Sequence, residues 1–305
     1  MHRIGVDLGG TKIEAAVLAP SGEMMVRRRV ATPTGYEPKL QAIAALVAAV
    51  ESETGVSVPH IGLGHPGSIN PRSGLVRNAN STQLNGRPLD QDLARLIDRP
   101  VVCANDANCF ALSEAVDGAG AHAHSVFGVI AGTGVGGGLV IGRKLVTGQD
   151  GNAGEWGHTP LGRPYPEEVP GPVCKCGLYG CVEAWCSGPA LAADHERRTG
   201  ERLTAREVAE AAEAGDIMAR ETLMHHRDRL ARSLATMVNI VDPGVIVIGG
   251  GLSHMSGLCT DLEKAMAPYL FTDEPRTQVA LHRHGDSSGV RGAAWLDPVV
   301  GDRAA

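Results

Sequence analysis

Three cysteines, Cys174, Cys176 and Cys181, fall within the eight-residue segment CKCGLYGC. Thiols at this spacing indicate a disulfide, a reactive thiol or a metal site, and small buried hydrophobic side chains are the structural alternative. The whole chain has seven cysteines in 305 residues, an odd number at low density, which argues against the disulfide framework of small secreted domains. We therefore expect reduced thiols, some of them bound to a metal ion.

The segment DLGGTK, residues 7–12, combines an acid at the end of an apolar run with two glycines, a hydroxyl and a cation. Glycines let backbone N–H groups approach phosphate oxygens, Thr11 and Lys12 add donors, and Asp7 can hold a hydrated Mg²⁺ ion. An ordinary hairpin turn is the alternative, because Gly-Gly turns are common.

Two further glycine loops follow later in the chain. Residues 132–137 fit G-x-G-x-x-G, but the nicotinamide enzymes that use this pattern need a helix directly after it, whereas LVIGRKLV continues as a strand. We therefore expect a phosphate-binding hairpin there. Residues 249–251, GGG, follow the buried strand VIVI, where backbone can pass under a flat ligand such as adenine or simply turn into a helix. The pattern G-x-x-x-x-G-K-[ST] does not occur, so a P-loop is excluded.

Acidic and amide side chains stand where a catalytic site would need them. CANDANCFALSE places Asn105 and Asp106 between a strand and a helix, where an aspartate can be a simple N-cap. Beside phosphate-binding loops, such an acid can instead take the proton of an alcohol that attacks a γ-phosphoryl group. Glu155 and His158 in GNAGEWGH, and Glu183 after the cysteines, add groups that suit the hydroxyls of a sugar.

The segment GDSSG, residues 285–289, matches the nucleophile elbow of the α/β-hydrolases. That class needs an acid and then a histidine after the serine, but the last histidine of this chain is His284. The order of the residues therefore excludes a hydrolase of this kind.

The elements that must position these residues repeat. RIGVDLGGTKIEAAVLA predicts a hairpin of two strands, and VFGVIAGTGVGGGLVIGRKLV at 126–146 has the same design, which indicates a weak internal duplication. Thr204 and Glu207 have capping-box spacing and predict the start of a helix. We expect two α/β lobes, residues 1–120 and 121–287, the second carrying a zinc-binding loop, and a final helix at about 288–305 that packs back on the first lobe.

Composition narrows the class of protein. The chain begins without a signal-peptide pattern and has no apolar run of the roughly 20 residues that a membrane span needs, so a soluble cytoplasmic protein is expected. Its net charge of −6 is spread without long blocks and gives no footprint for nucleic acid.

Seven motifs occur in the order seen in the ROK family (repressors, open reading frames, kinases), namely DLGGTK, GLGHPG, NDAN, GTGVGGG, GEWGH, CxCGxxGCxE and VIGGG. The chain resembles the sugar kinases of that family over nearly its whole length. NANSTQLNG, NDANCFALSEAVDG, AGEWGH, EEVPGPVCKCG and HGDSSGVRGAAWL resemble especially the bacterial fructokinase and mannokinase branch, and the likeness to N-acetylglucosamine kinases is weaker. The resemblance implies an actin-like (hexokinase/HSP70) ATPase fold, with two lobes and a central cleft that closes on ATP, Mg²⁺ and a hexose.

The resemblance also implies roles for single residues. Asp106 would be the general base. The sugar ligands would be Pro66, Gly67, Asn80, Asn105, Asp106, Glu155, His158 and Glu183. ATP and its Mg²⁺ would be bound by Asp7, Gly9, Gly10, Thr11, Lys12, Gly132, Thr133, Gly134, Gly250 and Gly251. His65 is a departure, because the family usually has an apolar residue there.

A structural zinc ion is implied as well, with His158, Cys174, Cys176 and Cys181 as its ligands. Three thiolates and one imidazole fill a tetrahedral Zn²⁺ site and leave no open position, so the metal would brace the protein rather than catalyse. One nitrogen of His158 would hold zinc while the other donates to a sugar hydroxyl. The other cysteines are expected in the core, at positions 103, 109, 186 and 259.

The predicted function is ATP-dependent phosphorylation of fructose, with mannose also accepted, at the 6-hydroxyl by a homodimer. One hydroxyl or acetamide group is read by a few side chains, so kinases for N-acetylglucosamine, N-acetylmannosamine or glucose stay open as alternatives. A sugar-responsive repressor of the same family is disfavoured, because only six residues precede Asp7 and leave no room for a helix-turn-helix.

Overall fold

The computed structural model describes residues 1–256 and 258–298. Contacts between residues divide the chain into two compact units, which are described separately. Unit 1 comprises Met1–Gly118, Leu145–Ala153 and the described part of Arg283–Ala305. Unit 2 comprises Ala119–Lys144 and the described part of Gly154–His282. The division into lobes at 120 and 287 remains a prediction, and the contact units differ from it by placing residues 119–120 in unit 2 and residues 145–153 and 283–287 in unit 1.

Unit 1 is built on a five-stranded sheet in the order β3-β2-β1-β4-β7. Its strands are β1 (Arg3–Leu8), β2 (Lys12–Leu18), β3 (Met24–Ala31), β4 (Ile61–His65) and β7 (Val101–Asn105). The first three strands are antiparallel, whereas β1, β4 and β7 run parallel, so their carboxyl ends meet at one edge of the sheet. The sequence DLGGTK forms the tight turn between β1 and β2, as its glycines predict.

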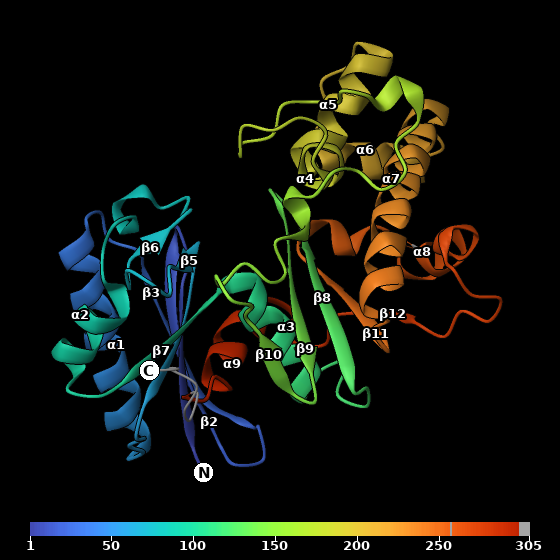
Figure 1. Cartoon of the computed structure of the whole chain (residues 1–305). Coiled ribbons are helices and arrows are strands. Elements are labelled where there is room, and N and C mark those ends of the chain that lie inside the picture. The colour runs from blue at the N-terminus through green and yellow to red at the C-terminus, as the bar shows by residue number, and fades with distance from the viewer. Residues whose placement is uncertain (257, 299–305) are drawn as a thin grey trace. The chain divides into compact units, whose positions relative to one another are not determined.

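The α-helices of unit 1 are α1 (Tyr36–Thr54), α2 (Leu89–Ile97), α3 (Asp106–Val116) and α9 (Ser288–Ala294). A small hairpin of β5 (Ser68–Ile69) and β6 (Val76–Arg77) is followed by the 3₁₀ turn η1 (Thr82–Leu84). In Figure 1, the red helix α9 lies against the strands of the sheet near the N-terminus. A Cβ atom on Gly62 would lie 1.7 Å from the carbonyl oxygen of Ala293, so the helix packs directly on the backbone of β4. The final helix packs on the first part of the chain as expected, but it ends at Ala294 and residues 295–298 are not helical, whereas residues 299–305 lie outside the described residues.

Unit 2 repeats the same plan with a sheet in the order β10-β9-β8-β11-β12. Its strands are β8 (Ser125–Ala131), β9 (Val135–Ile141), β10 (Lys144–Val146), β11 (Val245–Gly249) and β12 (Gln278–Leu281), and the boundary between the units falls within β10, after Lys144. The hairpin of β8 and β9 is antiparallel, and β11 pairs in parallel with both β8 and β12. The same order of pairings therefore recurs in both sheets, which agrees with the internal duplication read from the two glycine hairpins.

Unit 2 also contains five α-helices among the described residues, namely α4 (Val182–Cys186), α5 (Gly188–Thr199), α6 (Ala205–Glu213), α7 (Ile217–Val241) and α8 (Leu258–Met266). Its 3₁₀ turns are η2 (Trp156–His158), η3 (Pro166–Glu168), η4 (Gly251–His254) and η5 (Ala267–Tyr269), and η6 (Gly285–Ser287) lies in unit 1. Helix α6 begins with the predicted capping box, in which Thr204 and Glu207 satisfy each other's backbone N–H groups. No helix among the described residues is both long and apolar enough to cross a bilayer.

Candidate active site

A row of charged side chains crosses the sheet of unit 1. Asp7 on β1 is paired with Glu14 on β2, and Glu14 is paired with Arg29 on β3. Directly opposite residues of antiparallel strands share a face, so the three side chains lie side by side. Glu14 is fully buried, and its Oε1 lies 2.6 Å from the ammonium of Lys12 and 2.7 Å from Nε of Arg29, while Arg27 donates to Oε2. Lys12, a predicted phosphate ligand, is thus held by a carboxylate that sequence analysis had not identified as part of the site.

Asp7 has an unusually weak tendency to ionise. Its pKa is raised to about 7, mainly by burial and also by the negative charges of Asp106 and Glu14, against the opposing effect of Lys12 and Arg27. A divalent cation would relieve this repulsion by favouring the charged carboxylates. The pair of acids at the carboxyl ends of β1 and β7 therefore fits the predicted position of Mg²⁺ near Asp7.

Asn105 and Asp106 occupy the junction of β7 and α3. The side chain of Asn105 accepts the N–H of Ala107 at 2.8 Å and donates to the carbonyl oxygen of Gly67 at 3.0 Å. Asp106 also accepts from Ala107 N–H, at 2.8 Å, and its side chain is exposed. Asn105 therefore holds the loop after β4 in place, while Asp106 presents a carboxylate at the N-terminus of a helix, where negative charge is stabilised.

His65 ends β4 and is only 1% exposed. Its Nδ1 lies 2.9 Å from the carbonyl oxygen of Pro66, and burial lowers the pKa of the ring, which favours the neutral form. The imidazole is thus part of the interior of unit 1, and its effect on a ligand would pass through the Pro66-Gly67 loop that it supports.

The remaining predicted ligands of unit 1 lie in loops. Gly9, Gly10 and Thr11 form the turn between β1 and β2, in which Gly9 N–H donates to Lys12 O at 3.0 Å. Asn80 is exposed in the segment between β6 and η1. The backbone of the preceding Ala79 is held by hydrogen bonds with the side chain of Asn85.

Unit 2 contains a cavity of about 830 Å³. Two of the predicted glycine loops contribute to its wall, through Gly132, Thr133 and Gly251. Gly250 has a backbone φ of +85°, and a Cβ there would lie 2.4 Å from the carbonyl oxygen of Ala131, so this residue shapes the strand end behind the cavity. The volume lies in the range of small-molecule sites.

Sequence analysis did not identify the residues that form the rest of the cavity wall, beyond the glycine loops. They come from α5, α6 and η4, with the lining residues Gly188, Pro189, Ala192, Thr204, Ala205, Arg206, Ala209, Glu210, Glu213, Leu252, His254 and Met255. The only signal in the sequence was indirect, because the capping box at Thr204 located the start of α6 but not what the helix faces.

Glu183 lies behind the glycine loop of residues 132–137, which we call the second glycine loop. Its Oε2 accepts the N–H of Val135 at 2.9 Å, and a Cβ on Gly134 would lie 2.6 Å from the same oxygen. Glu155, the other predicted carboxylate of unit 2, is exposed just before η2, and its carbonyl oxygen accepts the N–H of His158. Of these predicted sugar ligands, Glu183 is therefore tied to the glycine loop and His158 to the cysteines.

His158, Cys174, Cys176 and Cys181 form one cluster, in which the ligand atoms all lie within 4.8 Å of one another. Nδ1 of His158 is 3.5 Å from the sulfur of Cys174, and the sulfurs of Cys176 and Cys181 are 3.6 Å apart. Ligands bound tetrahedrally to zinc at about 2.3 Å would lie roughly 3.8 Å apart, so the donor set and its spacing fit Zn²⁺. The other cysteines, at 103, 109, 186 and 259, are buried or partly buried.

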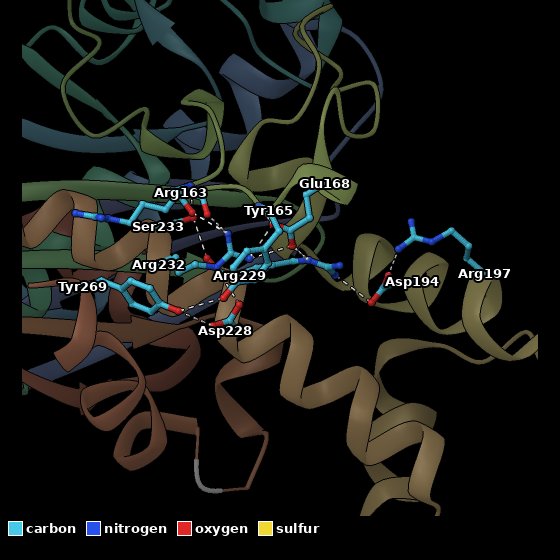
Figure 2. Close-up of polar contacts among 11 residues, drawn as sticks. Arg163, Tyr165, Glu168, Asp194, Arg197, Asp228, Arg229, Arg232, Ser233 and Tyr269 are labelled. Atoms are coloured by element: carbon cyan, nitrogen blue, oxygen red, sulfur yellow. Dashed lines mark hydrogen bonds and ion pairs between the residues drawn. The ribbon is translucent and has the colours of Figure 1, made fainter.

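A buried ionic cluster holds the loop that joins His158 to the cysteines (Figure 2). Both oxygens of Glu168 accept from Nη2 of Arg232 at 2.9 Å, and Oε1 also accepts from Nε of Arg229 at 2.8 Å. Arg232 has no exposed side-chain surface and also donates to Gly162 O, and Arg229 pairs with Asp194 on α5 at 3.0 Å. Burial alone raises the pKa of Glu168, but the hydrogen bonds from both arginines outweigh it and hold the pKa below its ordinary value. The loop is therefore fastened to α7 by charge.

The two sheets share one pairing order, each with a glycine hairpin, and the solved kinases that the structure resembles have the actin-like ATPase fold, which confirms the predicted fold class. A model of the ROK family matches residues 3–298, so the chain belongs to the ROK family. An N-acetyl-D-glucosamine kinase of Salmonella gallinarum is 38% identical over 301 residues, covering 96% of this chain and 98% of the relative. The crystal structure of a ROK hexokinase from Thermus thermophilus is 35% identical with a TM-score of 0.87 and covers 97% of each chain. A ROK family glucokinase from Streptomyces griseus, solved in complex with glucose and AMPPNP, is 31% identical with a TM-score of 0.77, covering 96% of this chain and 98% of that one.

Proposed function

We propose that this ROK-family sugar kinase transfers the γ-phosphoryl group of ATP to the 6-hydroxyl of fructose, with mannose as a second substrate. The kinase class rests on the family and on the named sugar kinases among its relatives. The observation that supports ATP as the donor is the cavity of unit 2, because glycine loops that can cradle phosphates form part of its wall.

The nucleotide would occupy that cavity, with its phosphates against Gly132, Thr133 and Gly134 and its adenosine beside Gly250 and Gly251. The turn of Gly9, Gly10, Thr11 and Lys12 would contribute further phosphate contacts. When bound, Mg²⁺ supplies positive charge that neutralises the phosphates, and Asp7 is the residue that would orient the hydrated ion.

Asp106 would accept the proton of the attacking hydroxyl as that oxygen bonds to the γ-phosphorus and the bond to ADP breaks. Its side chain is exposed at the start of α3, and Asn105 fixes the adjoining loop. The sugar would be oriented by Pro66, Gly67, Asn80, Asn105, Glu155, His158 and Glu183. These assignments remain proposals that rest on the matched motifs.

Zinc would have a structural role. His158, Cys174, Cys176 and Cys181 provide the four ligands, and a filled tetrahedron leaves no place for a substrate. The metal would fix the ring of His158, whose Nδ1 already faces the sulfur of Cys174. A homodimer and a cytoplasmic location also remain predictions.

Two candidate functions differ in the sugar that is phosphorylated. The segments NANSTQLNG, EEVPGPVCKCG and HGDSSGVRGAAWL support fructose and mannose through the branch that they resemble. N-acetylglucosamine is the second candidate, because relatives 38% identical over 96% of this chain carry that name. The same mechanism would serve either, since the difference lies in contacts to one part of the ring.

The experiment that tests the proposal measures ADP release from ATP and Mg²⁺ with fructose, mannose, glucose, N-acetylglucosamine and N-acetylmannosamine, compared by kcat/KM. Highest values for fructose or mannose support the proposal, and highest values for an acetamido sugar replace the substrate while keeping the mechanism. If none of the five sugars is turned over, the proposed kinase activity is wrong, and a sugar-responsive repressor becomes the favoured function.

A further inference from the structure

Lys175 stands between two of the clustered cysteines, and its side chain points to Glu183. Its Nζ lies 3.2 Å from Glu183 Oε1. The lysine side chain is 52% exposed, whereas that of Glu183 is only 11% exposed. A nearly buried carboxylate thus has one half-exposed cation on one of its oxygens.

The other oxygen of Glu183 is used by the second glycine loop. Oε2 accepts the N–H of Val135 at 2.9 Å, directly after Gly134. A Cβ on Gly134 would lie 2.6 Å from that oxygen and 3.8 Å from Nζ of Lys175. The loop, the carboxylate and the ammonium therefore form one packed group, and the absence of a side chain at Gly134 is what lets them meet.

This group lies directly behind a wall of the cavity. Gly132 and Thr133 line the cavity, and the loop is closed by a hydrogen bond from Gly132 N–H to Gly134 O at 2.9 Å. Helix α5 supports the same loop, because Gly188 N–H donates to Gly132 O at 2.7 Å. Any change in the position of Glu183 would therefore move the backbone that faces the ligand.

Glu183 and Lys175 have opposite effects on the binding of an anion in the cavity. A carboxylate a few ångströms from bound polyphosphate repels it, and the repulsion is only partly screened at this depth. The ammonium of Lys175 cancels that charge and holds the oxygen in place. Glu183 can thus support the loop without weakening its affinity for an anion.

We propose that Lys175 is a positioning residue that neutralises and orients Glu183 against the second glycine loop, and so favours the binding of nucleotide phosphates. The inference rests on the proposed binding of ATP in the cavity of unit 2. Lys175 does not itself touch the nucleotide in this scheme, because it acts through the carboxylate.

The test measures the Kd of a non-hydrolysable ATP analogue with Mg²⁺ by calorimetry on the full chain, at low and high salt. Lys175→Met should weaken binding about three- to fivefold at low ionic strength and less at high ionic strength, whereas Lys175→Arg should stay close to the unmodified protein. Metal content and thermal unfolding of each variant establish that the cysteine loop is intact.

A double-mutant cycle decides whether the effect passes through Glu183. In the Glu183→Gln background no carboxylate remains to be neutralised, so Lys175→Met should then change the Kd little. The same loss in both backgrounds, or no loss in Lys175→Met at either salt concentration, would overturn the inference alone. Absence of analogue binding by the unmodified protein would overturn both this inference and the proposed use of ATP.

Discussion

Asp7 and Glu14 are direct neighbours across β1 and β2, and Glu14 is fully buried whereas Asp7 is partly buried. Glu14 is matched by three cations, Lys12, Arg27 and Arg29. Asp7 keeps a raised pKa of about 7 in spite of Lys12 and Arg27. The sheet therefore holds one satisfied carboxylate beside one that is destabilised when charged and that a cation can stabilise.

Asp7→Asn should stabilise the ligand-free protein and abolish its activity. Between about pH 4 and pH 7 the native Asp7 keeps a proton that the unfolded chain has lost, so the free energy of unfolding falls as pH rises through this window and then stays level. Removing the carboxyl should therefore raise the free energy of unfolding by on the order of 2–4 kcal/mol at pH 8 and by much less at pH 4. Urea denaturation of both proteins at the two pH values measures the difference, and an equal gap at both would contradict the raised pKa.

Asp106→Asn should bind the nucleotide and the sugar but lose phosphoryl transfer by about 10²- to 10⁴-fold. The amide can still accept the hydrogen bond from Ala107 N–H, so α3 keeps its start while the base is lost. Binding by calorimetry and turnover by ADP release separate the two effects. Near-normal turnover would remove Asp106 from the role of base.

Cys176→Ser should release zinc and weaken hexose binding before it alters ATP binding. Cys176 is the exposed member of the cluster, so its loss opens the metal site with little disturbance of the core. Elemental analysis reports the metal, and Cys259→Ser is the matched control, because Cys259 is outside the cluster. Unchanged zinc in Cys176→Ser would show that the cluster is not the metal site.

Glu168→Gln should destabilise the protein by about 3–5 kcal/mol, because it leaves the buried guanidinium groups of Arg229 and Arg232 without their shared charge. The control is Glu167→Gln, where the neighbouring side chain is exposed and a change within about 0.5 kcal/mol is expected. Denaturant unfolding compares the two. If both variants were equally stable, the cluster would not fasten the loop to α7.

Adjacent glycines after β11 offer a matched pair of substitutions. Gly250→Ala forces a side chain into a positive φ of +85° and within 2.4 Å of Ala131 O, so unfolding should become easier by about 1–3 kcal/mol. A Cβ on Gly251 meets nothing within 4 Å, yet this residue lines the cavity. Gly251→Ala should therefore leave thermal stability unchanged and weaken nucleotide binding. Equal loss of stability in both variants would contradict this local geometry.

The sequence by itself determined those features that depend only on neighbouring residues. The glycine hairpins, the capping box at Thr204, and the order of motifs that places Asp106 at the start of a helix were all readable, because each depends on neighbouring residues. The close set of His158 and three cysteines was also anticipated through its resemblance to a known family. In the described residues their ligand atoms lie within 4.8 Å of one another, although whether zinc binds there remains a prediction.

Only the tertiary structure decided which distant residues meet. The pairing of Glu168 with Arg232 and the facing of α5 and α6 onto the glycine loops join segments far apart in the sequence. Glu14 meets its cations on neighbouring strands, but its complete burial is a result of the fold. The hydrophobic pattern of the sequence does not predict such contacts. A charged residue in a strand or helix is expected to be solvent-exposed, and only the packing of other elements shows that it is buried. The support of the second glycine loop by Glu183 and Lys175 belongs to this group, since only the fold places a side chain from the cysteine loop within reach of that carboxylate.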